Sequence, residues 1–128
     1  LNSTLPSTFG SMGDLKLFSM ARNHLTGSIP RQLSMMLDLE TFSVEFNKIG
    51  GTIPELFVTM KDLSVFNAHN NLIVGTLPTE FGALRKLTEL HVSQNRLNGN
   101  VPTELGYLKA LKTLRLNGNQ FTGTVPEE

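Results

Sequence analysis

Three residues with the side chains of a hydrolytic relay occur at equal spacing along the chain. Glu45, His69 and Ser93 supply a carboxylate, an imidazole and a hydroxyl, each 24 residues after the last. Such groups react only in the right mutual geometry, and a hydrolase also needs free N–H groups that stabilise a developing negative charge. On neighbouring parallel strands the N–H groups are used by the sheet, and an open sheet face encloses no substrate. We therefore predict no catalytic residues.

A metal site is a second reading of the same region. His69 and His91 would lie on neighbouring strands, with Glu45 and Glu89 close by, whereas His24 is too remote to join them. Two imidazoles with mobile carboxylates fall short of a well-specified ligand set. We predict no metal and no cofactor.

A repeat of 24 residues positions all of these side chains. Prolines stand at positions 6, 30, 54, 78, 102 and 126, and glycines at 27, 51, 75, 99 and 123, with no insertion or deletion between units. Self-similarity at this period predicts a stack of coils in which each unit buries its apolar face against the next.

The apolar residues of one unit, residues 79–102, change their spacing along the unit. Phe81, Leu84 and Leu87 follow a three-residue step, whereas Leu90 and Val92 follow a two-residue step. The first spacing fits a loose helical segment, and the second fits a short strand, which we expect over residues 89–93. Equivalent strands should lie parallel and in register, about 4.8 Å apart.

The combined pattern LxxLxLxxNxLxGxxP resembles the 24-residue, plant-type leucine-rich repeat of receptor-kinase ectodomains, receptor-like proteins and polygalacturonase-inhibiting proteins. The resemblance covers five repeats, at residues 7–30, 31–54, 55–78, 79–102 and 103–126. It implies an α/β solenoid, a right-handed superhelix with a parallel β-sheet on the concave side and 3₁₀ or short helices and loops on the convex side. Because no capping repeat is visible, we expect residues 1–128 to be a single domain segment, uncapped at both ends, of a longer protein.

One asparagine per unit has a structural task. A coil that turns inward after its strand leaves backbone groups that no neighbouring strand can reach, and an amide can both donate to and accept from them. We expect a structural ladder of five such residues: Asn23, Asn47, Asn71, Asn95 and Asn119.

The composition excludes two classes of partner. The 128 residues contain 11 Lys and Arg and 11 Asp and Glu, so no net field attracts nucleic acid or an anionic membrane. No apolar run approaches the roughly 18 residues of a membrane span, so we expect no membrane insertion by this segment. The resemblance implies an extracellular or cell-surface location, with the cytoplasm as the alternative. Asn2, in Asn-Ser-Thr, fits an N-glycosylation acceptor.

The outward-pointing strand residues are the candidate binding residues. We predict a ligand patch on the second to fourth coils, with Arg115 at its margin, formed by Glu45, Phe46, Asn67, His69, Glu89, His91 and Arg115. Phe46 is the sharpest of these, because its counterparts in the other coils are Arg22, Asn70, Gln94 and Gly118. It either anchors a ligand or folds over the strand edge onto a neighbouring coil.

The predicted function is recognition of a protein or peptide ligand by part of an extracellular receptor-type ectodomain, without enzymatic activity. The alternative is a secreted inhibitor of cell-wall-degrading enzymes, which shares this pattern. A minor alternative is an ice-binding surface, because hydroxyl residues follow the glycine of most units, at Ser28, Thr52, Thr76 and Thr124, with Asn100 breaking the row.

Overall fold

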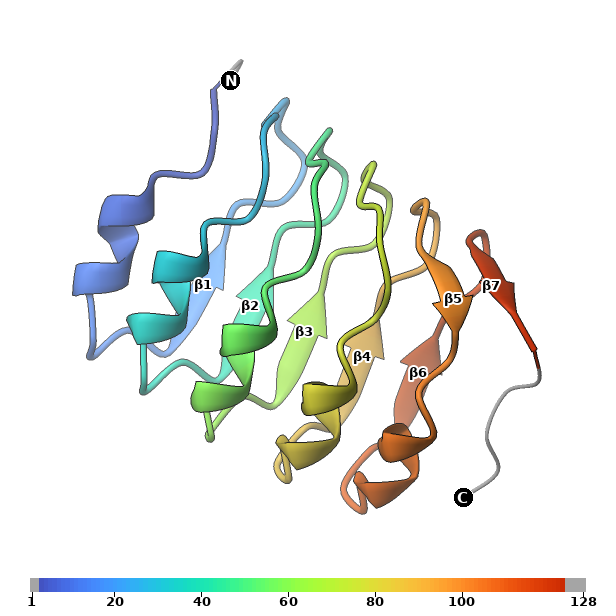
Figure 1. The fold of residues 1–128 in the computed structure, drawn as a ribbon. Coiled ribbons are helices and arrows are strands. Elements are labelled where there is room, and N and C mark those ends of the chain that lie inside the picture. The colour runs from blue at the N-terminus through green and yellow to red at the C-terminus, as the bar shows by residue number, and fades with distance from the viewer. Residues whose placement is uncertain (1–2, 124–128) are drawn as a thin grey trace.

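The computed structural model describes residues 3–123, in which each 3₁₀ helix is followed by a short strand (Figure 1). The 3₁₀ helices are η1 (Ser7–Ser11), η2 (Arg31–Met35), η3 (Glu55–Thr59), η4 (Thr79–Ala83) and η5 (Thr103–Tyr107). The main strands are β1 (Leu17–Ser19), β2 (Thr41–Ser43), β3 (Val65–Asn67), β4 (Glu89–His91) and β6 (Thr113–Arg115). The helices lie along one side of the coils and the main strands along the other, as the predicted solenoid requires.

The main strands form one parallel sheet in the order β1-β2-β3-β4-β6. Each strand is offset by one repeat, so that Phe42 pairs with Phe66 and Asn67 with His91. The expected strand over residues 89–93 ends at His91 in β4, but backbone hydrogen bonding continues, because Val92 N donates to Arg115 O at 3.0 Å and Gln94 N to Asn117 O at 2.9 Å. The strand pairing thus extends past His91, and the two-residue spacing of Leu90 and Val92 sets which side chains face outward.

The 3₁₀ helices follow the prolines of the repeat. Pro54 precedes η3 and Pro78 precedes η4, each in an extended conformation that places the next residue at the helix start. The three-residue apolar step matches a helix with three residues per turn, which points Phe57 and Phe81 into the stack.

Aromatic rings form the centre of the core. The rings of Phe18, Phe42 and Phe66 stack along the coils at 5.5 and 5.4 Å between centroids, and Phe57 meets Phe42 edge-on at 5.2 Å. Met60 is fully buried beside them. The coils at the two ends bury less, since their framework residues are only partly covered: Phe9, Leu15, Met20, Leu111, Leu114, Leu116 and Phe121.

The repeated asparagines bond to backbone groups of two coils. Asn71 Oδ1 accepts from Ile49 N at 3.0 Å, and its Nδ2 donates to Val44 O and Ala68 O, each at 3.1 Å. Asn95 makes the same contacts one coil further on. The amide thereby joins backbone groups that the main sheet does not pair.

A second ladder, which the sequence did not predict, flanks the coils. Its strands are β5 (Asn98–Asn100) and β7 (Gln120–Thr122), which pair in parallel, and isolated bridges such as Ser28–Gly50 continue it to earlier coils. The repeat glycines at positions 27, 51, 75 and 99 each lie under a hydroxyl residue of the previous coil, and Gly123 lies under Asn100. A Cβ on Gly75, whose φ is +83°, would lie 2.8 Å from Thr52 Cγ2, so this row needs glycine for both conformation and space.

Within residues 3–123, no helix is long and apolar enough to cross a membrane.

Candidate binding surface on the strand face

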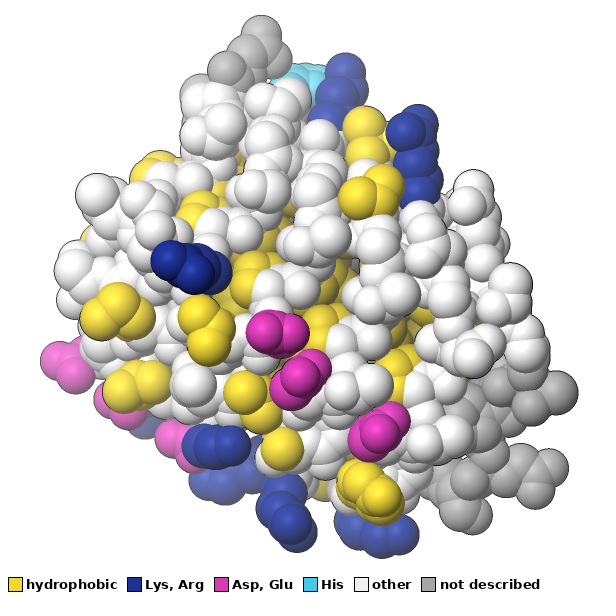
Figure 2. Space-filling view, viewed as in Figure 1, with side chains coloured by type: hydrophobic (Ala, Val, Ile, Leu, Met, Phe, Trp, Pro, Cys, Tyr) yellow, Lys and Arg dark blue, Asp and Glu magenta, His cyan; other side chains and the backbone are white. Residues whose placement is uncertain are grey.

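The outward side of the main sheet, here called the strand face, carries columns of side chains, in each of which every coil supplies the residue at the same repeat position. Because side chains alternate across a strand, Ser43, Asn67 and His91 point away from the core while Phe42, Phe66 and Leu90 are fully buried. The opposite side of the coils, which carries the 3₁₀ helices, shows apolar and charged side chains scattered among polar ones (Figure 2).

An open hollow of about 310 Å³ lies on the strand face across the third to fifth coils. Its lining residues come from three neighbouring strands and the residues just after them: Asn67, His69, His91, Ser93, Arg115 and Asn117. None of the six is acidic. Arg115 forms no salt bridge within the described part of the chain, so its positive charge is available to a ligand.

The imidazole of His69 is held from two sides. Its Nδ1 lies 2.7 Å from Ser93 Oγ, and its ring meets the ring of Phe46 edge-to-face at 5.0 Å. Glu45 does not complete a relay, because its carboxylate accepts a hydrogen bond from Ser43 Oγ. Ser93 is only 3% exposed, and a neighbouring amide, Gln94 N, is committed to the sheet. The arrangement therefore lacks the third member of a hydrolytic relay.

His91 is oriented by the carboxylate on its own strand, with Nε2 3.0 Å from Glu89 Oε1. No group of three residues able to hold a metal ion occurs among residues 3–123. His69 and His91 each form a side-chain hydrogen bond in this surface.

Phe46 lies at the edge of the strand face in an unusual backbone conformation. Its φ is +61°, in the left-handed region that non-glycine residues seldom adopt. The guanidinium of Arg22 lies over its ring, 4.3 Å from the centroid, and His69 contacts it from the next coil. Phe46 therefore contacts side chains of both neighbouring coils.

Comparison with known proteins identifies the repeat. A family model described as "Leucine rich repeat" matches residues 38–97, and a second, "Leucine Rich Repeat", matches residues 110–128. The chain is a leucine-rich-repeat protein. Comparison with curated proteins gives no match.

Solved structures share this leucine-rich-repeat fold over 98% of the chain. The plant peptide hormone receptor RGFR1, in complex with RGF2, is 30% identical with a TM-score of 0.96, and the chain covers 20% of it. A TDR receptor is 37% identical with a TM-score of 0.96, and 22% of it is covered. A plant ice-binding protein is 27% identical with a TM-score of 0.94, and 41% of it is covered. The chain thus spans about a fifth of the two receptor chains.

The leucine-rich-repeat stack brings four of the predicted ligand residues into the hollow, namely Asn67, His69, His91 and Arg115. Glu45, Phe46 and Glu89 lie outside its lining, although Phe46 and Glu89 contact the two histidines. Asn2, the predicted glycosylation residue, lies outside the described residues.

Sequence reasoning missed two residues of the hollow, Ser93 and Asn117. Both occupy the repeat position of His69, one and two repeats further along the chain. This equivalence in the sequence could have identified them. Sequence reasoning also missed the positive φ shared by the column of Phe46. Gly118 and Asn70 in that column were the signal, because these types tolerate the left-handed region best.

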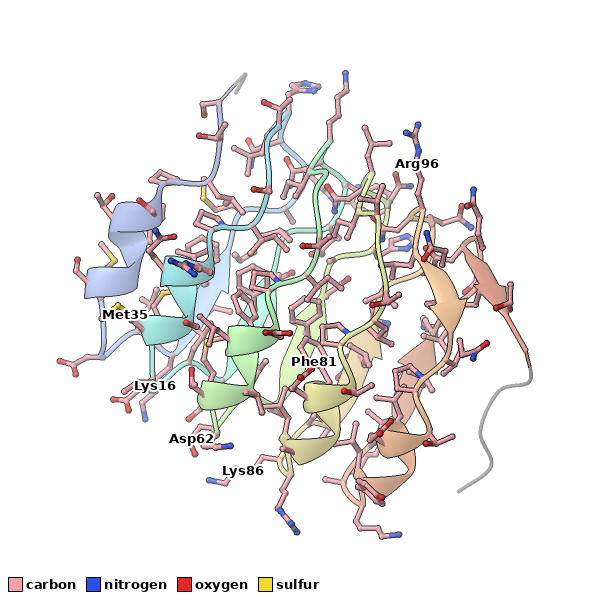
Figure 3. All side chains as sticks on the ribbon, viewed as in Figure 1. Lys16, Met35, Asp62, Phe81, Lys86 and Arg96 are labelled. Atoms are coloured by element: carbon pink, nitrogen blue, oxygen red, sulfur yellow. The ribbon has the colours of Figure 1, made fainter. Side chains whose placement is uncertain are left out.

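An exposed ion pair joins two coils at an edge of the stack. Lys86 Nζ lies 2.8 Å from Asp62 Oδ1, and the two side chains are adjacent in Figure 3. The hydrogen bond and the charge of Lys86 lower the pKa of Asp62, and the same carboxylate raises the pKa of Lys86. Neither group belongs to the hollow.

Proposed function

We propose that this chain is part of a receptor-type ectodomain of the 24-residue plant-type subclass, outside the cell or on its surface, and that it binds a peptide or protein segment on the strand face. The observation that carries the proposal is the hollow itself. It places two oriented imidazoles, two amides and a guanidinium that forms no salt bridge among the described residues on one open surface. Such groups can bind the carbonyl, amide and acidic groups of an extended peptide.

The similarity to a peptide hormone receptor solved with its ligand supports this assignment. Arg115 favours ligands that carry a carboxylate, since a guanidinium binds this group in a bidentate manner. We propose the same kind of ligand, and a role in signalling, for the whole protein.

Selection of binders from a displayed random peptide library tests the proposal. Selected peptides should bind the 128-residue chain and should lose affinity when Phe46, His69 and His91 are all replaced by alanine. A matched variant replaces three exposed residues of the opposite side, Met35, Leu56 and Tyr107, and should bind normally. Equal binding to the strand-face variant and the unchanged chain would show that this surface does not bind the ligand.

Ice binding is the second candidate, favoured by the similarity to a plant ice-binding protein. Ser28, Thr52 and Thr76 are exposed in one row beside the second ladder. Thermal hysteresis of the purified chain tests this function. Its absence would leave the row with a packing role over the glycines of the next coil.

A further inference from the structure

The two histidines of the hollow are held through different ring nitrogens. His69 uses Nδ1 toward Ser93 Oγ, and His91 uses Nε2 toward Glu89 Oε1. Among the described residues, the other nitrogen of each ring has no hydrogen-bond partner. Both rings line the hollow, and no side-chain nitrogen of the described residues is buried without a partner, so these free nitrogens are accessible to a ligand.

Burial of Ser93 fixes the hydrogen on His69. Ser93 is only 3% exposed. Within residues 3–123, the hydrogen-bond partner of its hydroxyl is the ring of His69. A buried O–H without an acceptor costs more than an unused lone pair, so the hydroxyl donates to Nδ1. The neutral ring of His69 then carries its hydrogen on Nε2, which becomes a donor.

The carboxylate of Glu89 fixes the hydrogen on His91. An ionised carboxylate only accepts hydrogen bonds, so Nε2 of His91 must carry a hydrogen. In the neutral ring Nδ1 is then a free acceptor. The two rings share a tautomer but present opposite groups to the hollow.

We propose that His69 and His91 form a donor and acceptor pair that reads an amide group of the ligand. Nε2–H of His69 donates to the amide oxygen, and Nδ1 of His91 accepts from the amide N–H. The ligand group is either the carboxamide of an Asn or Gln side chain or a main-chain peptide group. The proposal rests on the proposed function, because it names the chemistry of a peptide bound in the same hollow.

Phe46, Ser93 and Glu89 are positioning residues in this pair. Phe46 limits rotation of the His69 ring by its edge-to-face contact, Ser93 selects the ring's tautomer, and Glu89 does the same for His91. None of the three lines the hollow with a group free for the amide, since Ser93 Oγ is already bonded to His69.

The tautomers can be measured without a ligand. Nitrogen-15 spectra of the neutral histidine side chains in the 128-residue chain should show Nε2–H for both His69 and His91. Exposed His24, whose ring forms no hydrogen bond with another side chain among the described residues, is the internal reference for ring exchange between tautomers. Ser93→Ala should release His69 to that exchange and leave His91 unchanged. Predominant Nδ1–H on His69 in the unchanged chain would overturn the proposal.

Small amides then test the reading of the ligand. N-acetylglutamine methylamide carries both a side-chain and a main-chain amide, whereas N-acetylalanine methylamide carries only the latter. Titration of either that shifts both ring signals, with a severalfold weaker response in Ser93→Ala and in Glu89→Gln, supports the pair. An equal response to both probes assigns the main chain, and a stronger response to the glutamine probe assigns the carboxamide.

Rings that hold the inferred tautomers but respond to neither probe would overturn amide reading. The proposed function fails by a different measurement, namely if the selected peptides bind equally well to the unchanged chain and to the variant with alanine at Phe46, His69 and His91.

Discussion

At the scale of single residues, Asn71 shows how one side chain supports two coils. It is 5% exposed and bonds to Ile49 N, Val44 O and Ala68 O. Asn71→Ala leaves Ile49 N without a partner and removes one of the two amide hydrogen bonds at Val44 O and at Ala68 O, so we expect the free energy of unfolding to fall by about 2 kcal/mol in urea titrations. Asn98→Ala, at an exposed site, should change it by less than about 0.5 kcal/mol. Equal effects of the two substitutions would contradict the ladder's role.

Phe46 allows a test of backbone strain. At φ +61° a residue with a Cβ pays a conformational cost that glycine does not, so Phe46→Gly should be more stable than Phe46→Ala by about 1 kcal/mol. At Ser43, inside β2, the order should reverse, because glycine weakens an ordinary strand. Thermal unfolding of the four variants measures both differences. An alanine variant more stable than the glycine variant at position 46 would exclude the strain.

At the scale of elements, η4 and η5 approach closely at Gly82. A Cβ there would lie 2.5 Å from Glu104 O, so Gly82→Ala must push the two helices apart. We expect a loss of about 1–3 kcal/mol in stability. Gly13→Ala is the matched control, because its added Cβ would meet nothing within 4 Å. A neutral Gly82→Ala would mean that the helices have room to separate.

The ion pair between Asp62 and Lys86 joins the third and fourth coils. The pKa of Asp62 is lowered by the hydrogen bond and charge of Lys86, so its stabilising effect is lost as pH falls through that lowered pKa. The pKa of Lys86 is raised, and its effect is lost as pH rises through that raised pKa. In Lys86→Ala the pKa of Asp62 should return toward its ordinary value, which NMR titration of the carboxyl group measures. High salt should restore this value in part, whereas salt independence would argue against the pair.

At the scale of the whole molecule, burial is uneven along the stack. Phe42, Phe66 and Leu90 of the inner coils are fully buried, whereas Met20 and Leu114 of the outer coils are only partly covered. In a repeat stack each coil depends on its neighbours, so opening should begin at the ends. Amide hydrogen exchange of the 128-residue chain should be slowest in β2 to β4. Slowest exchange in β1 or β6 would contradict this order.

The sequence by itself determined the repeat, the coil and the columns. Proline, glycine and asparagine recur at a fixed period, and the change from a three-residue to a two-residue apolar step places a 3₁₀ helix and a strand in each coil. Since an equal period puts equivalent residues on neighbouring strands, the proximity of His69 and His91 also followed. These features depend only on the number of residues between equivalent positions, which can be read directly from the sequence.

Only the tertiary structure decided which groups bond within those columns. Glu45 turns to Ser43 instead of His69, His69 bonds Ser93, and Phe46 packs between Arg22 and His69. The second ladder likewise appeared only when the coils were stacked. The physical reason is that a column gives each side chain several neighbours at similar spacing, and rotamers, backbone φ and burial select among them.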